Sequence, residues 1–153
     1  NLIKELELEE YFELSNLENM IPTTYLIGIW AQLDVLDKYK FNNTEKESII
    51  KINELMNKDL LNYNNLYQYG LYISTIVSEI KGIDKKIVNE RYNSLYIHNK
   101  RDIKISAEEI CELLNRKPGK YLSEIFNDLE YKLVNKLIEN DKEIIKQYIL
   151  ENY

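Results

Sequence analysis

Apolar residues recur along most of the chain at the three- and four-residue spacing of amphipathic helices. The clearest stretch follows Pro118-Gly119, where six apolar side chains fall on one stripe: Leu122, Ile125, Phe126, Leu129, Leu133 and Leu137. No alternating apolar and polar run is long enough to indicate a strand. Only 4 glycines and 2 prolines interrupt the chain. The pattern predicts an all-α fold, with about eight short to medium helices in an irregular bundle.

The first two helices are expected near the N-terminus. Residues 2–14 mix Leu, Tyr and Phe with glutamates, which suits a helix with one apolar side. Pro22 suits the first turn of a second helix, because the missing proline N–H is not needed there. We expect this helix to end near Lys38 and to bury Trp30 in the core.

The third helix should open with a capping box. The Thr44 hydroxyl can accept from the Glu47 backbone N–H while the Glu47 side chain reaches back. An Asn-rich turn over 62–65 should separate it from a fourth helix that contains two glycines. Gly70 suggests a close helix crossing, and Gly82 suggests a C-terminal stop.

The same start signals continue to the end of the chain. Asp84 should cap the fifth helix. Ser106 and Glu109 have the spacing of a second capping box. Asn140 and Glu143 should cap the last helix.

Composition narrows the classes of function. A hydrophobic fraction of 44% with 30% charged residues is that of an ordinary globular protein. No apolar run could cross a bilayer and no secretion signal is evident, so we expect a cytoplasmic protein with no membrane partner. Cys111 cannot form an internal disulfide and is expected to be buried and inert. With His98 the only histidine, multi-His metal clusters are excluded, and His98 itself is expected in a loop without a catalytic partner.

The charge distribution singles out residues 98–120. The net charge of −6 argues against a broad basic surface. This stretch nevertheless holds six cations against four acidic residues, and they are the candidates for phosphate contacts: Lys100, Arg101, Lys104, Arg116, Lys117 and Lys120. The helix start after Pro118-Gly119 adds backbone N–H groups that suit a phosphate. Alternatively, these are solvated residues of a connection, with Arg101 and Asp102 as structural ties.

The thirteen tyrosines have two interpretations. They could stack on bases, as in single-strand binders. Tyrosines at helical spacing, such as Tyr69, Tyr92 and Tyr148, are more often half-buried core residues whose hydroxyl stays in water.

An ordered series of motifs in the last third carries a resemblance to a known family. The series runs Arg101-Asp102-Ile103, then Lys117-Pro118-Gly119, then Asn140-Asp141-Lys142-Glu143. It resembles the end of bacterial class II CCA-adding enzymes, the tRNA nucleotidyltransferases related to poly(A) polymerases. Upstream, Lys40-Phe41-Asn42-Asn43 and Leu66-Tyr67-Gln68-Tyr69-Gly70-Leu71 look like segments of the helical body of such enzymes.

The resemblance implies a division of labour. In that family a head domain with two metal-binding carboxylates adds CMP and AMP to the tRNA 3′ end, a neck selects the nucleotide, and a body and tail hold the tRNA. No Gly-Ser followed by Asp-x-Asp is present here, so the chain would be a body over 1–97 and a tail over 98–153. The missing initiator Met fits a fragment of a longer protein.

For such a fragment the resemblance implies tRNA as the partner, bound through backbone and shape contacts. It implies no catalytic residues and no metal or cofactor in the fragment. Mg²⁺, ATP and CTP would belong to the missing head domain, so the fragment alone should be inactive. The oligomeric state is left open.

Two other classes of function remain. A helical protein–protein interaction module would fit the acidic charge and the missing catalytic residues. An enzyme that uses carboxylates alone is the third. The glutamates from Glu5 to Glu13 are usually a solvated helix face, although paired carboxylates there could bind Mg²⁺ weakly.

Overall fold

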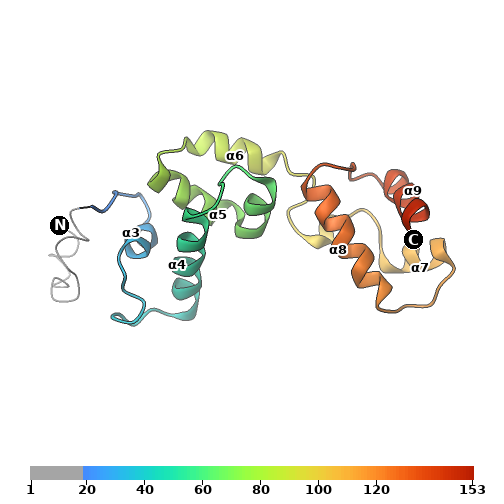
Figure 1. The fold of residues 1–153 in the computed structure, drawn as a ribbon, viewed down its shortest axis with the longest axis horizontal. Helices are drawn as coiled ribbons and strands as arrows, with labels where there is room; N and C mark the ends of the chain where they lie inside the picture. The colour runs from blue at the N-terminus through green and yellow to red at the C-terminus, as the bar shows by residue number, and fades with distance from the viewer. Residues whose placement is uncertain (1–18) are drawn as a thin grey trace. The chain divides into compact units, whose positions relative to one another are not determined.

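A computed structural model describes residues 19–153. These residues form seven α-helices and one 3₁₀ helix, and no strand occurs among them (Figure 1). The elements in order are α3 (Leu26–Gln32), α4 (Asn43–Met56), α5 (Tyr63–Lys81), α6 (Lys85–Asn93), η2 (Lys100–Asp102), α7 (Ala107–Leu114), α8 (Tyr121–Val134) and α9 (Lys142–Asn152). The all-α prediction is confirmed. The helix expected over 2–14 and its run of glutamates lie outside the described residues.

The chain divides into two compact units. The N-terminal unit is Asn1–Glu90 and the C-terminal unit is Arg91–Tyr153. Inside the N-terminal unit, α4 packs against both α3 and α5, and inside the C-terminal unit α7 contacts α9. None of the described helices is both long and apolar enough to span a bilayer.

The core of the N-terminal unit contains aromatic rings. Trp30 is 7% exposed, which confirms the prediction. Its ring stacks on Tyr39 with centroids 5.4 Å apart and meets the edge of Phe41 at 5.6 Å. Helix α4 buries Ile49, Ile52 and Leu55, which follow one another at three-residue spacing.

Helix α3 is shorter than the sequence indicated. It begins at Leu26 rather than Pro22 and ends at Gln32 rather than near Lys38. The Gln32 side chain explains the late start, because it bonds both the N–H and the carbonyl of Ile21, each at 2.7 Å. These two bonds hold the segment around Ile21 against the end of α3. The segment therefore cannot add a turn to the start of the helix.

The capping box of α4 lies two residues before the predicted one. Asn42, not Thr44, accepts from the backbone N–H of Glu45, and the Glu45 carboxylate accepts from the Asn42 N–H, both at 2.9 Å. Asparagine is as good an N-cap residue as serine or threonine, so both Asn42 and Thr44 could cap α4.

The glycines of the N-terminal unit have different roles from those predicted. Gly70 has φ +79° and ψ +170°, which bends α5, and a Cβ there would have open space, so the predicted close crossing at Gly70 is wrong. The close approach is at Gly28, where a Cβ would lie 2.7 Å from Thr23 Oγ1 and 2.9 Å from Ile76 Cγ2. Gly82 ends α5 in the left-handed conformation, as predicted.

The core of the C-terminal unit is aliphatic throughout. Its buried apolar residues are Leu95, Ile97, Ile103, Ile105, Ile110, Ile125, Leu129, Leu133, Val134, Ile145 and Ile149. The Ser106–Glu109 capping box of α7 is confirmed. Asp141, rather than Asn140, caps α9 by accepting from two backbone N–H groups.

Candidate nucleic-acid interface

The turn η2 fixes the backbone of Lys100 and Arg101. The Asn99 side chain accepts from the Arg101 N–H at 2.8 Å. The Asp102 carboxylate accepts from the N–H groups of His98 at 2.8 Å and Asn99 at 3.3 Å. Asp102 is therefore a structural tie, which was one of the two interpretations of the sequence. The hydrogen bonds of Asn99 and Asp102 fix the backbone turn that carries Lys100 and Arg101.

Asn140 holds the segment that carries Lys104. Its Oδ1 accepts from the Lys104 N–H at 3.1 Å, and its Nδ2 donates to the carbonyls of Asp102 at 2.8 Å and Tyr96 at 3.4 Å. This is why Asn140 does not cap α9. One side chain joins the backbone on both sides of η2 to the start of α9.

Lys100 and Arg101 differ in their partners. Lys100 Nζ donates to Asn127 Oδ1 at 2.7 Å and lies 3.9 Å from a Glu130 carboxylate oxygen, so it attaches η2 to α8. Within residues 19–153 the Arg101 guanidinium makes no hydrogen bond and no ion pair. Its charge is therefore available to a ligand.

These two cations border a depression of about 600 Å³. The other residues that line it come from the first two turns of α8: Leu122, Ser123, Phe126 and Asn127. Leu122 and Phe126 were expected in the core stripe, but both are only half-buried. The depression, which we call the η2–α8 depression, thus combines cations, polar groups and one aromatic ring.

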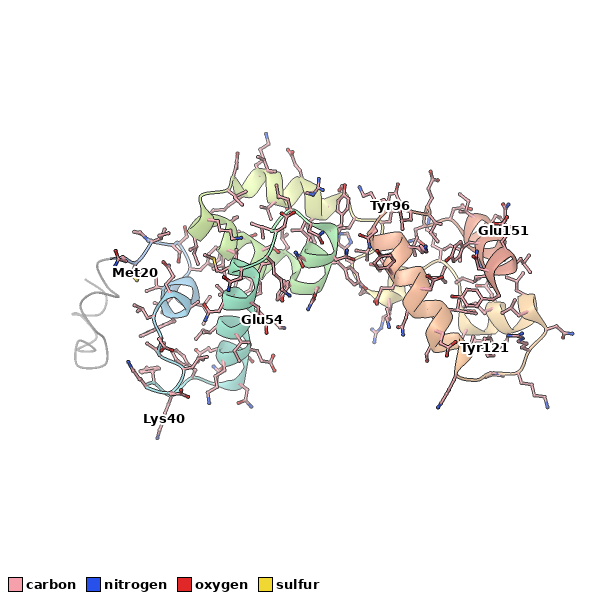
Figure 2. The ribbon with its side chains drawn as sticks, viewed as in Figure 1. Met20, Lys40, Glu54, Tyr96, Tyr121 and Glu151 are labelled. Atoms are coloured by element: carbon pink, nitrogen blue, oxygen red, sulfur yellow. The ribbon has the colours of Figure 1, made fainter. Side chains whose placement is uncertain are left out.

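The remaining predicted cations lie in the loop before α8. Arg116, Lys117 and Lys120 are exposed there, and the Arg116 guanidinium lies over the Tyr121 ring at 5.6 Å from its centroid. Figure 2 labels Tyr121 at the start of α8. Five of the six cations therefore form two groups, one at η2 and one in this loop, and Lys104 lies exposed after η2.

Cys111 is close to this loop. It is partly exposed rather than buried as predicted, and its Sγ lies 3.4 Å from the Tyr121 hydroxyl. The hydrogen bond with Cys111 is the main cause that raises the pKa of Tyr121. The thiol therefore lies beside the loop that carries Arg116.

The start of α8 already uses some of its backbone donors. Leu122 N–H donates to the Gly119 carbonyl at 3.2 Å, and Ser123 N–H donates to the Lys120 carbonyl at 3.0 Å. Glu124 adds a negative charge in the first turn. Phosphate binding at this helix end would therefore rely on the loop cations more than on the N–H groups.

Sequence reasoning missed the polar residues of the depression. Ser123 and Asn127 are four residues apart, so they share one face of α8. That spacing was visible in the sequence. What it could not show is that η2, more than twenty residues earlier, would lie against this face.

The described residues do not fit a metal centre. Among residues 19–153 no three His, Cys, Asp or Glu side chains come together in a way that could hold a metal ion.

One family model and several relatives match the chain. A family model described as tRNA nucleotidyltransferase domain 2, putative, matches residues 23–149. The CCA-adding enzyme of Streptococcus suis (strain 05ZYH33) is 26% identical over 157 residues, which cover 95% of this chain and 39% of that enzyme. The CCA-adding enzyme of Streptococcus pneumoniae (strain CGSP14) is 34% identical over 71 residues, which cover 46% of this chain and 18% of that enzyme.

A solved structure has the same fold. The crystal structure of the Bacillus stearothermophilus CCA-adding enzyme in complex with CTP superposes with a TM-score of 0.70 at 20% identity, over 97% of this chain and 42% of that one. The chain thus spans less than half the length of the relatives that it matches.

Proposed function

Because the chain belongs to the tRNA nucleotidyltransferase domain 2 family, we propose that it is the tRNA-binding body and tail of a CCA-adding enzyme. The body comprises residues 1–97 and the tail residues 98–153. The parent enzyme adds CMP and AMP to the 3′ end of tRNA. The observation that carries the proposal is the family match over residues 23–149, which includes most of both parts.

The tail holds the RNA backbone through cations that make no ion pair among residues 19–153. Arg101, Lys117 and Lys120 are exposed, and their side chains make no ion pair within the described part of the chain. Lys100 is less available, since it is shared with Asn127 and Glu130. Charge-assisted contacts of this kind position a phosphate backbone and carry no sequence information. The chain accordingly recognises tRNA by backbone and shape.

Nucleotide transfer itself belongs to a head domain outside this sequence. Mg²⁺ there would supply charge stabilisation for phosphoryl transfer from ATP and CTP. The residues of this chain orient the tRNA and take no part in the chemistry. Incubation of the chain with tRNA, CTP, ATP and Mg²⁺ should give no incorporation of nucleotide, and incorporation would contradict the non-catalytic role.

A titration of the chain with tRNA tests the binding role. We expect a gel shift that weakens steeply between 50 and 200 mM salt, because bound cations displace counterions from the phosphates. The variant Arg101→Glu, Lys117→Glu, Lys120→Glu should lose the shift. The matched control Lys38→Glu, Lys46→Glu, Lys86→Glu carries the same charge change on exposed lysines of the N-terminal unit and should retain it. A chain that shows no shift at either salt concentration would support the protein-interaction alternative.

A further inference from the structure

We propose that the η2–α8 depression binds one unstacked nucleotide of a single-stranded RNA segment. The phosphate lies at Arg101, the base lies against the Phe126 ring, and Ser123 and Asn127 bond the ribose or the base edge. This inference rests on the proposed function and adds the kind of RNA element that the tail takes. A duplex keeps its bases stacked, so it could offer phosphates and 2′-hydroxyls here but no base for the Phe126 ring.

The charge at the depression comes mainly from Arg101. The nearest carboxylate in sequence, Asp102, is engaged by the N–H groups of His98 and Asn99. Glu130 faces Lys100 at 3.9 Å and offsets that charge. The Arg101 side chain has no hydrogen bond and no ion pair within the described residues. A guanidinium can bond two phosphate oxygens at once.

The size and lining of the depression suit a nucleotide. Small-ligand sites have volumes of roughly 300 to 1,000 Å³, and this one has about 600 Å³. Leu122 and Phe126 are half-buried and leave apolar surface open inside it. Aromatic side chains bind unstacked RNA bases through their faces without regard to base identity.

The polar groups lie one helical turn apart on the same wall. Asn127 Oδ1 is taken by Lys100, which turns the Asn127 amide N–H₂ into the group left for a ligand. The exposed Ser123 hydroxyl can donate or accept. Together they match the mixed donor and acceptor character of a 2′-hydroxyl or a base edge.

Two variants separate the base contact from the phosphate contact. Binding of a fluorescein-labelled single-stranded RNA hexamer to the 153-residue chain is measured by anisotropy at several salt concentrations. Phe126→Leu keeps the apolar volume but loses the stacking face, so we expect about tenfold weaker binding with an unchanged salt slope. Arg101→Gln removes one phosphate contact, so the slope should fall by about 0.7. Lys86→Gln also removes one positive charge, but from the N-terminal unit, and it should leave the salt slope unchanged.

Ser123→Asp tests the site without harming the fold. Ser123 is the third residue of α8, where an acidic residue favours the helix, while its charge would repel a phosphate in the depression. We expect loss of hexamer binding at an unchanged melting temperature. Asn43→Asp, the same charge change in the first turn of α4, should not alter binding.

Three outcomes would overturn the inference. One is equal affinity for the hexamer and for a 12-base-pair RNA duplex. Another is that the Phe126→Leu variant binds the hexamer as tightly as the unaltered chain does. The third is equally effective displacement of the hexamer by an oligoglutamate peptide, because the depression would then be a general anion site. If tRNA still binds in these cases, the proposed function is kept and only the nucleotide site is rejected. If tRNA fails to bind as well, both fail.

Discussion

The two units differ in where they keep their aromatic rings. The N-terminal unit buries Trp30, Phe41 and Tyr69 in its core. The C-terminal unit, which is described completely, buries only Ile, Leu and Val. All of its rings are half-buried or exposed, and two of them lie beside cations, with Arg116 over Tyr121 and Lys136 over Tyr96 at 5.3 Å. Figure 2 labels Tyr96 and Tyr121 in this unit.

The difference teaches how each unit is held together. Rings that pack on one another stabilise the N-terminal unit by burial. The helices α7, α8 and α9 have 8, 14 and 11 residues, and polar side chains tie the irregular segments to them. Because its rings and several cations are not used for the core, the C-terminal unit can present them to a ligand that carries both bases and phosphates.

Removing a ring should show the largest contrast. Trp30→Ala should lower the free energy of unfolding by about 4 kcal/mol, because the cavity would remove contacts with Tyr39 and Phe41. Tyr131→Ala in the C-terminal unit, whose ring is 55% exposed, should change it by less than about 0.5 kcal/mol. Urea unfolding followed by circular dichroism measures both. Equal losses would break the comparison.

The polar ties of the C-terminal unit should rank next. Asn140→Ala removes one acceptor and two donor bonds to the backbone around η2, so a loss of about 2 kcal/mol is expected. Asn140→Asp keeps the acceptor for the Lys104 N–H but sets a carboxylate oxygen against the carbonyls of Asp102 and Tyr96, so it should cost at least as much as the alanine variant. A change below about 0.5 kcal/mol for the alanine variant would mean that these bonds do not hold η2.

Asp128 provides a test that depends on pH. It accepts from the hydroxyls of Tyr148 at 2.5 Å and Tyr153 at 3.0 Å. Burial and the Asp128 carboxylate raise the pKa of Tyr148 well above its usual range, and the same causes raise the pKa of Tyr153. The neutral phenol is thus favoured by folding, so its contribution is complete below the unfolded pKa of about 10 and is lost as the pH rises through the folded value.

Tyr148→Phe should therefore cost about 1.5 kcal/mol at pH 7. The difference from the unaltered chain should shrink as the pH rises above about 10. Unfolding by urea at pH 7, 9 and 11 measures it. A difference that is constant, or that grows with pH, would refute the assignment of the effect to the Tyr148 hydroxyl.

The smallest effect is expected from the helix caps, where the two units are alike. Ser106→Ala should cost about 1 kcal/mol, because the Glu109 N–H loses its acceptor. Ser106→Gly should lower the free energy of unfolding by only a few tenths of a kcal/mol. Asn42→Ala in α4 should match Ser106→Ala. A large gap between the two alanine variants would show that caps also contribute differently in the two units.

The sequence could predict what depends on neighbours along the chain. The helical pattern, the Ser106–Glu109 box and the stop at Gly82 need only local spacing, and they are confirmed. Two caps were predicted at the wrong residue, at Thr44 instead of Asn42 for α4 and at Asn140 instead of Asp141 for α9. Several neighbouring polar side chains can cap a helix start, and which one does so depends on what packs nearby. The six candidate cations could be named but not grouped, because the contact of η2 with α8 joins Lys100 to Asn127 across 27 residues.

The backbone of Gly70 has a consequence for how the N-terminal unit opens. Its φ of +79° and ψ of +170° lie in a region that essentially only glycine adopts. The helical φ and ψ angles are interrupted there, so we expect the two halves of α5 to open as separate cooperative segments. Amide hydrogen exchange would then proceed independently on the two sides of Gly70, and α5 would report two local opening free energies rather than one.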